Sequence, residues 1–371
     1  MLPVQNTRNA VRGDRCTAAS GEAGPTGLLA WCIVPAFLLI TAGCARHPTL
    51  PALPLPATRT PAIAVDPETG QRRLQLSVLI YNVAGLPWPV RTGRSAALRQ
   101  IGRQLEEMRA AGTAPDLLLL QEAFTAEAAR IGVRAGYLNG VRGPRRTDRP
   151  GIDVSSLDRA FLAGRRFFNG EKAGKLLSSG LYIYSDYPIH ALYSTPFGRH
   201  TCAGFDCLAN KGVMVAEITI PGVPARLQVL NTHLNSRAAS GVSHVRSLYA
   251  HNRQVDEIAT LLARTRHQDQ PFIFGGDFNT RRSEARFDYK IDRIPGTVVD
   301  YYCVVEADDC DVRISWDGDA PWMDTQDLQG FESGTLVAVR PIRVEAMFDQ
   351  PYRGRMLSDH DGYLVTYELS W

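Results

Sequence analysis

Polar residues that can bind a metal or move a proton stand beside several apolar runs of the sequence. They are Asn82 after LSVLIY, Glu122 after DLLLLQ, Asn231 and His233 after LQVL, Asp277 and Asn279 after FIFGG, and Asp359 and His360 before the last apolar run. One polar residue at the end of a strand is ordinarily a cap or part of a turn. Five such places that carry only Asn, Asp, Glu and His predict that the strand ends meet at one site, as in α/β enzymes.

The residue types narrow the chemistry of that site. Carboxylate and amide oxygens are the ligands of hard cations such as Mg²⁺ or Mn²⁺, and no thiolate cluster favours a softer metal. The two histidines can act as base and acid. Together these groups predict attack of water on a phosphate ester with the help of a metal ion. The alternative, Ser-His-Asp hydrolysis, would need a GxSxG turn, which the sequence lacks.

Apolar periodicity places these residues on strands that alternate with helices. Strands are expected at 74–83, 116–122, 181–185, 213–219, 227–231, 272–276 and 363–369. Apolar residues three and four positions apart predict helices at 95–111 and 245–262. Residues 139–160 and 281–325 lack a regular pattern and are expected to form long surface loops. We interpret residues 68–371 as one catalytic domain with sheets covered by helices.

The first 43 residues are interpreted as an export signal. Three arginines precede an uncharged apolar run at 28–43, which is too short to span a membrane and contains Pro35. ThrAlaGlyCys at 41–44 resembles a bacterial lipobox, so Cys44 is expected to carry lipid and to anchor the exported protein in a membrane, facing the periplasm or the cell exterior. An ordinary cleaved signal and an uncleaved anchor are the alternatives.

Six prolines in residues 44–67 predict an extended tether between the membrane and the catalytic domain. A proline-rich docking ligand is the other interpretation of this segment. The tether and the signal also explain the odd number of cysteines, which is seven. Cys16 and Cys32 leave with the signal and Cys44 carries lipid.

Four cysteines then remain in an oxidising compartment, and an even number suggests disulfides. The close pairs Cys202/Cys207 and Cys303/Cys310 give the simplest connectivity, although four cysteines allow three. No CxxC pair or neighbouring histidine indicates zinc.

Composition excludes several classes of protein. The chain has 371 residues, 44% of them hydrophobic, with 41 Lys and Arg against 38 Asp and Glu. These values exclude a disordered, collagen-like or polytopic membrane protein. A net charge of +3 gives no case for a strong basic field that holds nucleic acid mainly through its phosphates.

Six segments, in order, resemble the motifs of the endonuclease/exonuclease/phosphatase superfamily. They are NVAGLP, LLLLQE, SSGLYIYSDYPI, NTHLNS, GGDFN and LSDHDGYLVTY. The resemblance covers most of the chain after the tether. It implies a four-layer α/β sandwich in a single domain, with two packed, mainly antiparallel sheets flanked by helices. Deoxyribonuclease-like and sphingomyelinase-like enzymes share this fold.

The resemblance also implies a cofactor, Mg²⁺ or Mn²⁺. Glu122 would be its main ligand, with help from Asn82 and with Asp359 nearby. The protein would act on its phosphodiester as a monomer.

Catalytic roles follow from the same motifs. Asp277 and Asn279 would orient the attacking water and hold the phosphate. His360 would be the general base, and His233 would stabilise or protonate the leaving oxygen. The residues expected to contact the substrate or its phosphate are Asn82, Asn279, Asn235 and Lys211.

One expected residue has no clear match. Members of the superfamily orient the catalytic histidine with an aspartate from an upstream strand, and VRPIRVEAMFD contains no such pattern. Asp327 in TQDLQGFESG is the candidate, with Asp324 as the second choice. Without an orienting partner the histidine base would lose its fixed tautomer.

Two details favour the sphingomyelinase-like branch. His233 in NTH resembles that branch, and Asp206 with Lys211 resembles the Asp…Lys pair that can hold a lysine in or out of the active site of neutral sphingomyelinases. A surface ion pair is the simpler explanation of Asp206 and Lys211. No aromatic hairpin for entering a bilayer is evident, since Trp316 and Trp322 can simply be packed.

Other functions remain open at this point. The basic stretch at 142–149 is compatible with a nuclease. An inositol-phosphate or other phosphomonoesterase is also possible on this fold, as is a lipid-anchored protein that binds without catalysis. A binding protein has no need for all of Glu122, Asp277, Asn279, Asp359 and His360, which makes an enzyme the better hypothesis.

Overall fold

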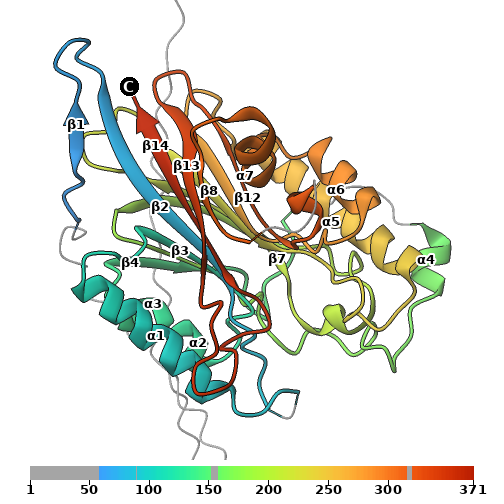
Figure 1. The fold of residues 1–371 in the computed structure, drawn as a ribbon. Coiled ribbons are helices and arrows are strands. Elements are labelled where there is room, and N and C mark those ends of the chain that lie inside the picture. The colour runs from blue at the N-terminus through green and yellow to red at the C-terminus, as the bar shows by residue number, and fades with distance from the viewer. Residues whose placement is uncertain (1–57, 89, 152–157, 316–319) are drawn as a thin grey trace, which may run out of the picture. The chain divides into compact units, whose positions relative to one another are not determined.

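A computed structural model describes residues 58–88, 90–151, 158–315 and 320–371 (Figure 1). The expected signal at 1–43, the expected lipidation site Cys44, most of the expected tether and Trp316 lie outside the described residues. Within them, no helix is both long and apolar enough to cross a membrane.

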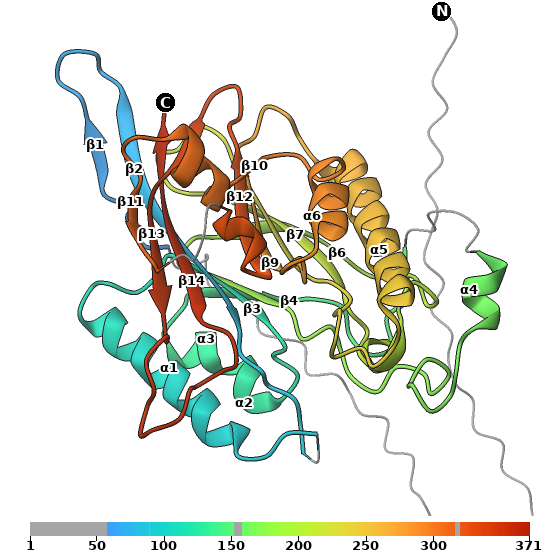
Figure 2. The same cartoon turned by 45° about the vertical axis from the view of Figure 1, so that its right-hand side comes forward.

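Two mixed sheets form the centre of the domain (Figures 1 and 2). The first has the order β11 (Asp311–Arg313), β13 (Ala338–Met347), β14 (Gly362–Ser370), β2 (Arg72–Asn82), β3 (Leu117–Gln121), β5 (Tyr182–Ser185) and β4 (Asn139–Arg142), with β1 (Ile63–Val65) also paired to β2. The second has the order β10 (Thr297–Val298), β12 (Asp327–Glu332), β9 (Phe272–Asp277), β8 (Leu227–His233), β7 (Gly212–Ile218) and β6 (Ile189–Pro196). Pairing is antiparallel except in β2–β3, β8–β9 and β11–β13.

Helices cover the outer faces of both sheets. Against the first sheet lie α1 (Arg94–Ala110), α2 (Ala126–Ala129) and α3 (Ile131–Arg134), and against the second lie α5 (His244–Thr265) and α6 (Glu284–Ile291) (Figure 2). The shorter elements are α4 (Arg159–Ala163), η1 (Gly204–Leu208), α7 (Val299–Tyr301), η2 (Tyr302–Glu306) and η3 (Pro321–Met323). This confirms the predicted four-layer α/β sandwich.

The sequence of β3 shows why the layers form. Leu117 and Leu119 point into the core between the sheets, while Leu118 and Leu120 point into the core under α1. Successive side chains of a strand face opposite sides, so a continuous apolar run suits a strand that is covered on both faces. Ala52–Trp371 form one compact unit with these cores, and we expect this domain to fold without the residues before it.

Three sequence predictions about irregular segments were wrong. The expected loop 281–325 contains α6, β10, α7, η2, β11 and η3, and the expected loop 139–160 begins with β4. The end of the expected tether pairs with the sheet as β1, where Ile63 lies opposite Leu74. The folded domain therefore begins before residue 68.

Candidate active site

Strand register brings three of the predicted residues side by side. His233 on β8 lies opposite Asp277 on the parallel strand β9, and Asp327 on β12 lies opposite Asp277 on the other side. The two glycines before Asp277 allow this close packing. A Cβ on Gly275 would lie 2.6 Å from Ile80, and one on Gly276, at φ 142°, would lie 2.1 Å from the carbonyl oxygen of Thr232.

The first sheet contributes Asn82 and Glu122 from the ends of β2 and β3. The Nδ2 of Asn82 donates to Glu122 Oε1 at 3.2 Å and to Asp277 Oδ2 at 3.0 Å, so it connects the two sheets. The Oδ1 of Asn82 accepts from the Ala84 N–H at 3.1 Å. Asn82 therefore presents its N–H groups to the two carboxylates and positions them, and its role as a metal ligand stays a prediction.

His360 and Asp327 form a dyad. The Nδ1 of His360 lies 2.6 Å from Asp327 Oδ2, while Asp324 is a surface residue bonded to Arg282. Of the two candidates from the sequence, the structure thus brings Asp327 to the histidine. When the proton is on Nδ1, Nε2 of His360 can accept from Gln326 Nε2 at 2.9 Å. Gln326 was not predicted.

The charges around His360 favour its protonated form. Burial alone lowers the pKa of this imidazole, but the charge and hydrogen bond of Asp327, with the charges of Asp277 and Asp359, outweigh burial and raise the pKa to about 10. Without a bound cation the neighbouring carboxylates therefore stabilise the protonated form of His360. A positive charge beside the carboxylates would favour the neutral form, which can accept a proton.

Replacing Asp327 by asparagine should move the pH dependence of hydrolysis to lower pH. The carboxylate raises the pKa of His360, so its removal lowers that pKa, and activity that depends on neutral His360 should appear at a lower pH. The maximal rate should fall about tenfold or more because the imidazole is held less firmly. The measurement is kcat/KM against pH. Asp324→Asn is the matched control and should leave the profile in place; an unmoved acid limb in Asp327→Asn would contradict the role of the dyad.

Glu122, Asp277 and Asp327 have no Lys or Arg as an ion-pair partner among the described residues, and Asp277 and Asp327 lie beside His360 instead. Burial raises the pKa of Glu122, and burial followed by the charge of Asp327 raises the pKa of Asp277 to about 7. Among the described residues, no Lys, Arg or His nitrogen forms an ion pair with Glu122. Asp277, Asp327 and His360 also offer ligand atoms within 4.8 Å of one another. An oxygen-rich, negative site of this kind fits a hard divalent cation.

Asp359 is placed differently from the expected ligand set. Its side chain is 48% exposed and forms an ion pair with Arg91. Arg91 lowers the pKa of Asp359 against the opposing effect of partial burial. Arg91 therefore competes with a cation for the carboxylate of Asp359.

Lys211 and Asp206 form a buried pair and not a surface one. Lys211 contacts Asp206, lies 3.0 Å from His233 Nε2, and donates to the Leu234 carbonyl at 2.9 Å. Their side chains are 6% and 10% exposed. Burial, followed by the charges of Lys211 and His360, keeps the pKa of His233 well below its ordinary value. His233 is thus neutral and poorly suited to donate a proton in this arrangement.

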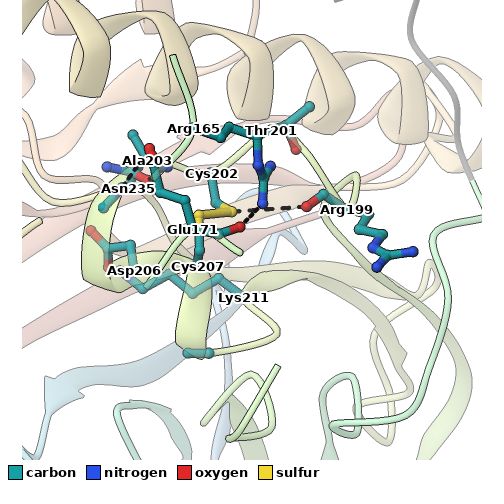
Figure 3. The surroundings of a disulfide bond; sticks show 12 residues. Arg165, Glu171, Arg199, Thr201, Cys202, Ala203, Asp206, Cys207, Lys211 and Asn235 are labelled. Atoms are coloured by element: carbon teal, nitrogen blue, oxygen red, sulfur yellow. Dashed lines mark hydrogen bonds and ion pairs between the residues drawn. A yellow bond between two sulfur atoms is a disulfide. The ribbon is translucent and has the colours of Figure 1, made fainter. Parts of the chain in front are cut away.

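A disulfide closes the segment that carries Asp206 (Figure 3). Cys202 is joined to Cys207 there, and Cys303 is joined to Cys310 before β11. These are the two pairs of the simplest connectivity predicted from the sequence.

Asn235 does not reach the substrate pocket, contrary to the prediction. Its Oδ1 accepts from the Ala203 N–H at 2.8 Å and its side chain is buried, so it holds the start of η1.

The polar residues open into one pocket of about 590 Å³. It is lined by Glu122, His233, Asp277, Asn279, Asp359, His360, Asp206 and Lys211, together with apolar residues and arginines. Asn82, Asn235 and Asp327 stand behind this lining and position it. A larger pocket of about 650 Å³ beside α4 and the start of α5 contains none of these groups.

Arg286 on α6 is a supporting residue that the sequence did not reveal. It is 1% exposed and donates to the carbonyls of Asn235 at 2.7 Å and Asn279 at 3.0 Å. Ser358 is a second one, since its hydroxyl donates to the Asn82 carbonyl at 2.7 Å and accepts from the His360 N–H at 3.3 Å. It ties the histidine loop to the end of β2.

Backbone conformation at the site is unusual. Glu122 and Asn279, which both line the pocket, have φ values of 53° and 54°, in the left-handed region that favours glycine. Such conformations cost free energy and cluster at functional sites. They turn both side chains into the pocket directly after their strands end.

Comparison with known proteins agrees with this geometry. Residues 79–360 match the model of the endonuclease/exonuclease/phosphatase family. A comparison with curated proteins gave no significant match.

Several solved structures share the fold. Beta toxin from Staphylococcus aureus is 17% identical with a TM-score of 0.54, covering 78% of this chain and 99% of its own. Sphingomyelinase C from Streptomyces griseocarneus is 19% identical with a TM-score of 0.53, covering 79% and 99%. D. rerio TDP2 in complex with a single-strand DNA product is 18% identical with a TM-score of 0.52, covering 79% and 98%. At these identities the likeness establishes the fold alone.

Proposed function

The chain belongs to the endonuclease/exonuclease/phosphatase family, and on that premise we propose that it hydrolyses a phosphodiester by metal-assisted attack of water. The observation that carries this proposal is the His360–Asp327 dyad beside two carboxylates, the half-buried Glu122 and the buried Asp277, in one pocket. A base with an orienting partner and a hard-cation site are the two parts that such a hydrolysis needs.

His360 takes the proton of the attacking water at Nε2 while Asp327 holds Nδ1. Asp277 and Asn279 orient that water. The Asn279 amide donates to the Leu234 carbonyl at 3.1 Å and its backbone N–H donates to Asp277 Oδ1 at 3.0 Å, so its Oδ1 is left to face the pocket. Gln326 gives up its contact with His360 when water binds there.

Lys211 provides the positive charge on the other side of the scissile phosphate. Asp206 fixes Lys211 next to neutral His233, and together Lys211 and His233 stabilise the leaving oxygen. Glu122 is the residue that would hold Mg²⁺ or Mn²⁺, with Asp359 as a further ligand once Arg91 releases it. The cation would act as a Lewis acid on the phosphate oxygens.

A phospholipid head group is the substrate that we favour, in a sphingomyelinase- or phospholipase C-like reaction. The buried Asp206–Lys211 pair supports it, and so do the apolar side chains of Leu86, Val90 and Phe205 in the pocket wall. The proposed export signal and the lipid on Cys44 would place the enzyme at a membrane.

A nuclease is the second candidate because of the arginines at the same pocket. Arg91, Arg237 and Arg281 line it and can contact further phosphates of a nucleic acid. The basic stretch at 142–149 lies at a separate, smaller pocket.

The test is a comparison of sphingomyelin vesicles, plasmid DNA and inositol phosphates as substrates in the presence of Mg²⁺. We expect release of phosphocholine from sphingomyelin at a rate well above cleavage of the other two. Cleavage of DNA alone would favour the nuclease, and turnover of inositol phosphates alone would favour a phosphomonoesterase. Failure to hydrolyse any of the three substrates would leave a binding protein as the better hypothesis.

A further inference from the structure

Four large apolar side chains are exposed close to the catalytic pocket. The exposed fractions are 91% for Phe168, 62% for Phe167, 60% for Leu176 and 51% for Phe205. The two neighbouring phenylalanine rings touch edge to face with their centroids 5.9 Å apart. We call these four residues the apolar rim. Soluble domains rarely gather so much exposed apolar surface unless it contacts a partner or a membrane.

The segments that carry the apolar rim adjoin the pocket. Leu208 connects its two segments, because the Leu176 N–H donates to the Leu208 carbonyl at 2.7 Å and a Cβ on Gly170 would lie 3.0 Å from the Leu208 side chain. Phe205 and Leu208 themselves line the catalytic pocket. A surface that covered the apolar rim would therefore meet the mouth of the active site.

A buried glutamate fixes the position of the apolar rim. Glu171 is 1% exposed and accepts from the Arg166 N–H at 2.8 Å, the Gly204 N–H at 3.1 Å and Arg246 Nε at 2.6 Å. It thus ties the segment of Phe167 and Phe168 to η1 and to α5. The phenylalanines are held outward by a defined structure, which lowers the entropy lost when they bind.

The charges around these side chains are positive. In the segment RRFFNGEK (165–172), Arg166 and Lys172 are exposed, while the acidic residue Glu171 is buried and paired with Arg246. Aromatic side chains beside exposed basic groups are typical of surfaces that lie in the interface of an anionic membrane.

A second exposed apolar pair comes from the segment before α1. Trp88 is 79% exposed and Val90 is 68% exposed, and Val90 also lines the catalytic pocket. Aliphatic side chains such as Val90 and Leu176 offer no ring on which a nucleic-acid base can stack. They suit the hydrocarbon of a lipid layer better than single-stranded DNA.

We propose that the apolar rim is a docking surface for an anionic lipid bilayer, which brings the mouth of the catalytic pocket against the lipid head groups. Phe167 and Phe168 enter the interface, and Arg166 and Lys172 contact the anionic lipids. That the docked enzyme then hydrolyses those head groups rests on the proposed function; the docking itself does not.

The experiment is co-sedimentation of the domain from Ala52 onward with phosphatidylcholine vesicles that contain or lack phosphatidylglycerol. The Phe167→Ser/Phe168→Ser variant should bind about tenfold more weakly or worse, because two aromatic side chains no longer leave water. The matched control is Val133→Ser/Leu336→Ser, which removes side chains exposed at 69% and 59% away from this surface and should bind as the parent does. α3, which carries Val133, lies across the molecule from α4 (Figures 1 and 2).

A second variant keeps the test independent of the phenylalanines. Arg166→Glu/Lys172→Glu should remove the dependence on phosphatidylglycerol. Hydrolysis of soluble bis(p-nitrophenyl) phosphate should be unchanged in both variants, which would show that the pocket is intact. If the parent lacks this activity, the proposed function is contradicted, but the sedimentation experiment still tests the docking proposal. Unchanged vesicle binding in both variants would overturn the docking proposal. So would a loss of affinity for a fluorescent single-stranded oligonucleotide with vesicle binding retained, since the apolar rim would then be a nucleic-acid surface.

Discussion

Replacing His360 by alanine should lower the rate of phosphodiester hydrolysis by about 10²–10⁴-fold, the range expected for loss of a general base. No other described side chain holds the same position: His233 is buried against Lys211 and Asp277, and Gln326 cannot accept a proton. The measurement is kcat with saturating Mg²⁺ on the best substrate of the panel above.

The control for this variant is His190→Ala, because His190 is exposed on β6 and lies outside the pocket lining. It should keep full activity. A thermal melt should show that His360→Ala is folded. Activity within about twofold of the parent would exclude His360 as the base, since loss of a general base costs far more than that.

Glu122→Gln should abolish most of the activity and weaken metal binding. The substitution keeps the shape of the side chain and removes the charge that would hold the cation. A divalent cation contributes several kcal/mol of transition-state stabilisation, so the rate should fall about 10²-fold or more. Calorimetry with Mn²⁺ and activity against the concentration of Mg²⁺ are the two measurements. A chelator should abolish hydrolysis by the parent protein in the same assay.

Stability separates this effect from a damaged fold. Removal from water disfavours the charge of the partly buried Glu122 and raises the pKa of its carboxyl group, so a neutral glutamine should leave the domain at least as stable at neutral pH. Glu127→Gln on α2, where the carboxylate is 30% exposed and paired with Arg99, is the matched control. Mn²⁺ affinity equal to that of the parent in Glu122→Gln would place the metal on other residues.

Much of the site was predictable because catalytic residues follow apolar strands. Glu122 and Asp277 stand directly after runs that are apolar on both faces, so the strand, its end and the polar residue were visible together. Asp327 was harder to assign. Its strand, DLQGFE, has no apolar run, and only the pairing of β12 with β9 places it beside Asp277 and His360.

The helix α6 was missed for a related reason. Its buried positions are Arg286, Phe287 and Lys290, two of which are charged. The apolar periodicity that indicates a helix was therefore absent. Arg286 is buried because it donates to the backbone carbonyls of two site residues, and Lys290 because it lies 3.9 Å above the ring of Phe274. Those partners come from distant parts of the chain.

The apolar rim could not be predicted either. Phenylalanines in RRFFNG look like core residues in a sequence, and exposure depends on how the buried Glu171 fixes the backbone around them. The sequence shows no aromatic hairpin for entering a bilayer, and the apolar rim is not a hairpin. These side chains lie on a loop and on a 3₁₀ turn.

The left-handed backbone conformation of Glu122 and Asn279 lowers the stability of the domain, while the side chains of these residues are needed for its activity. Glycine would adopt these conformations without the penalty of about 1 kcal/mol or more that other residues incur, yet glycine has no oxygen to offer to a cation or a water. Selection for a more stable domain alone would thus favour the change that destroys the chemistry. A screen of random variants for thermal tolerance should enrich inactive proteins at these two positions, and engineering of this enzyme for robustness should leave both residues unchanged.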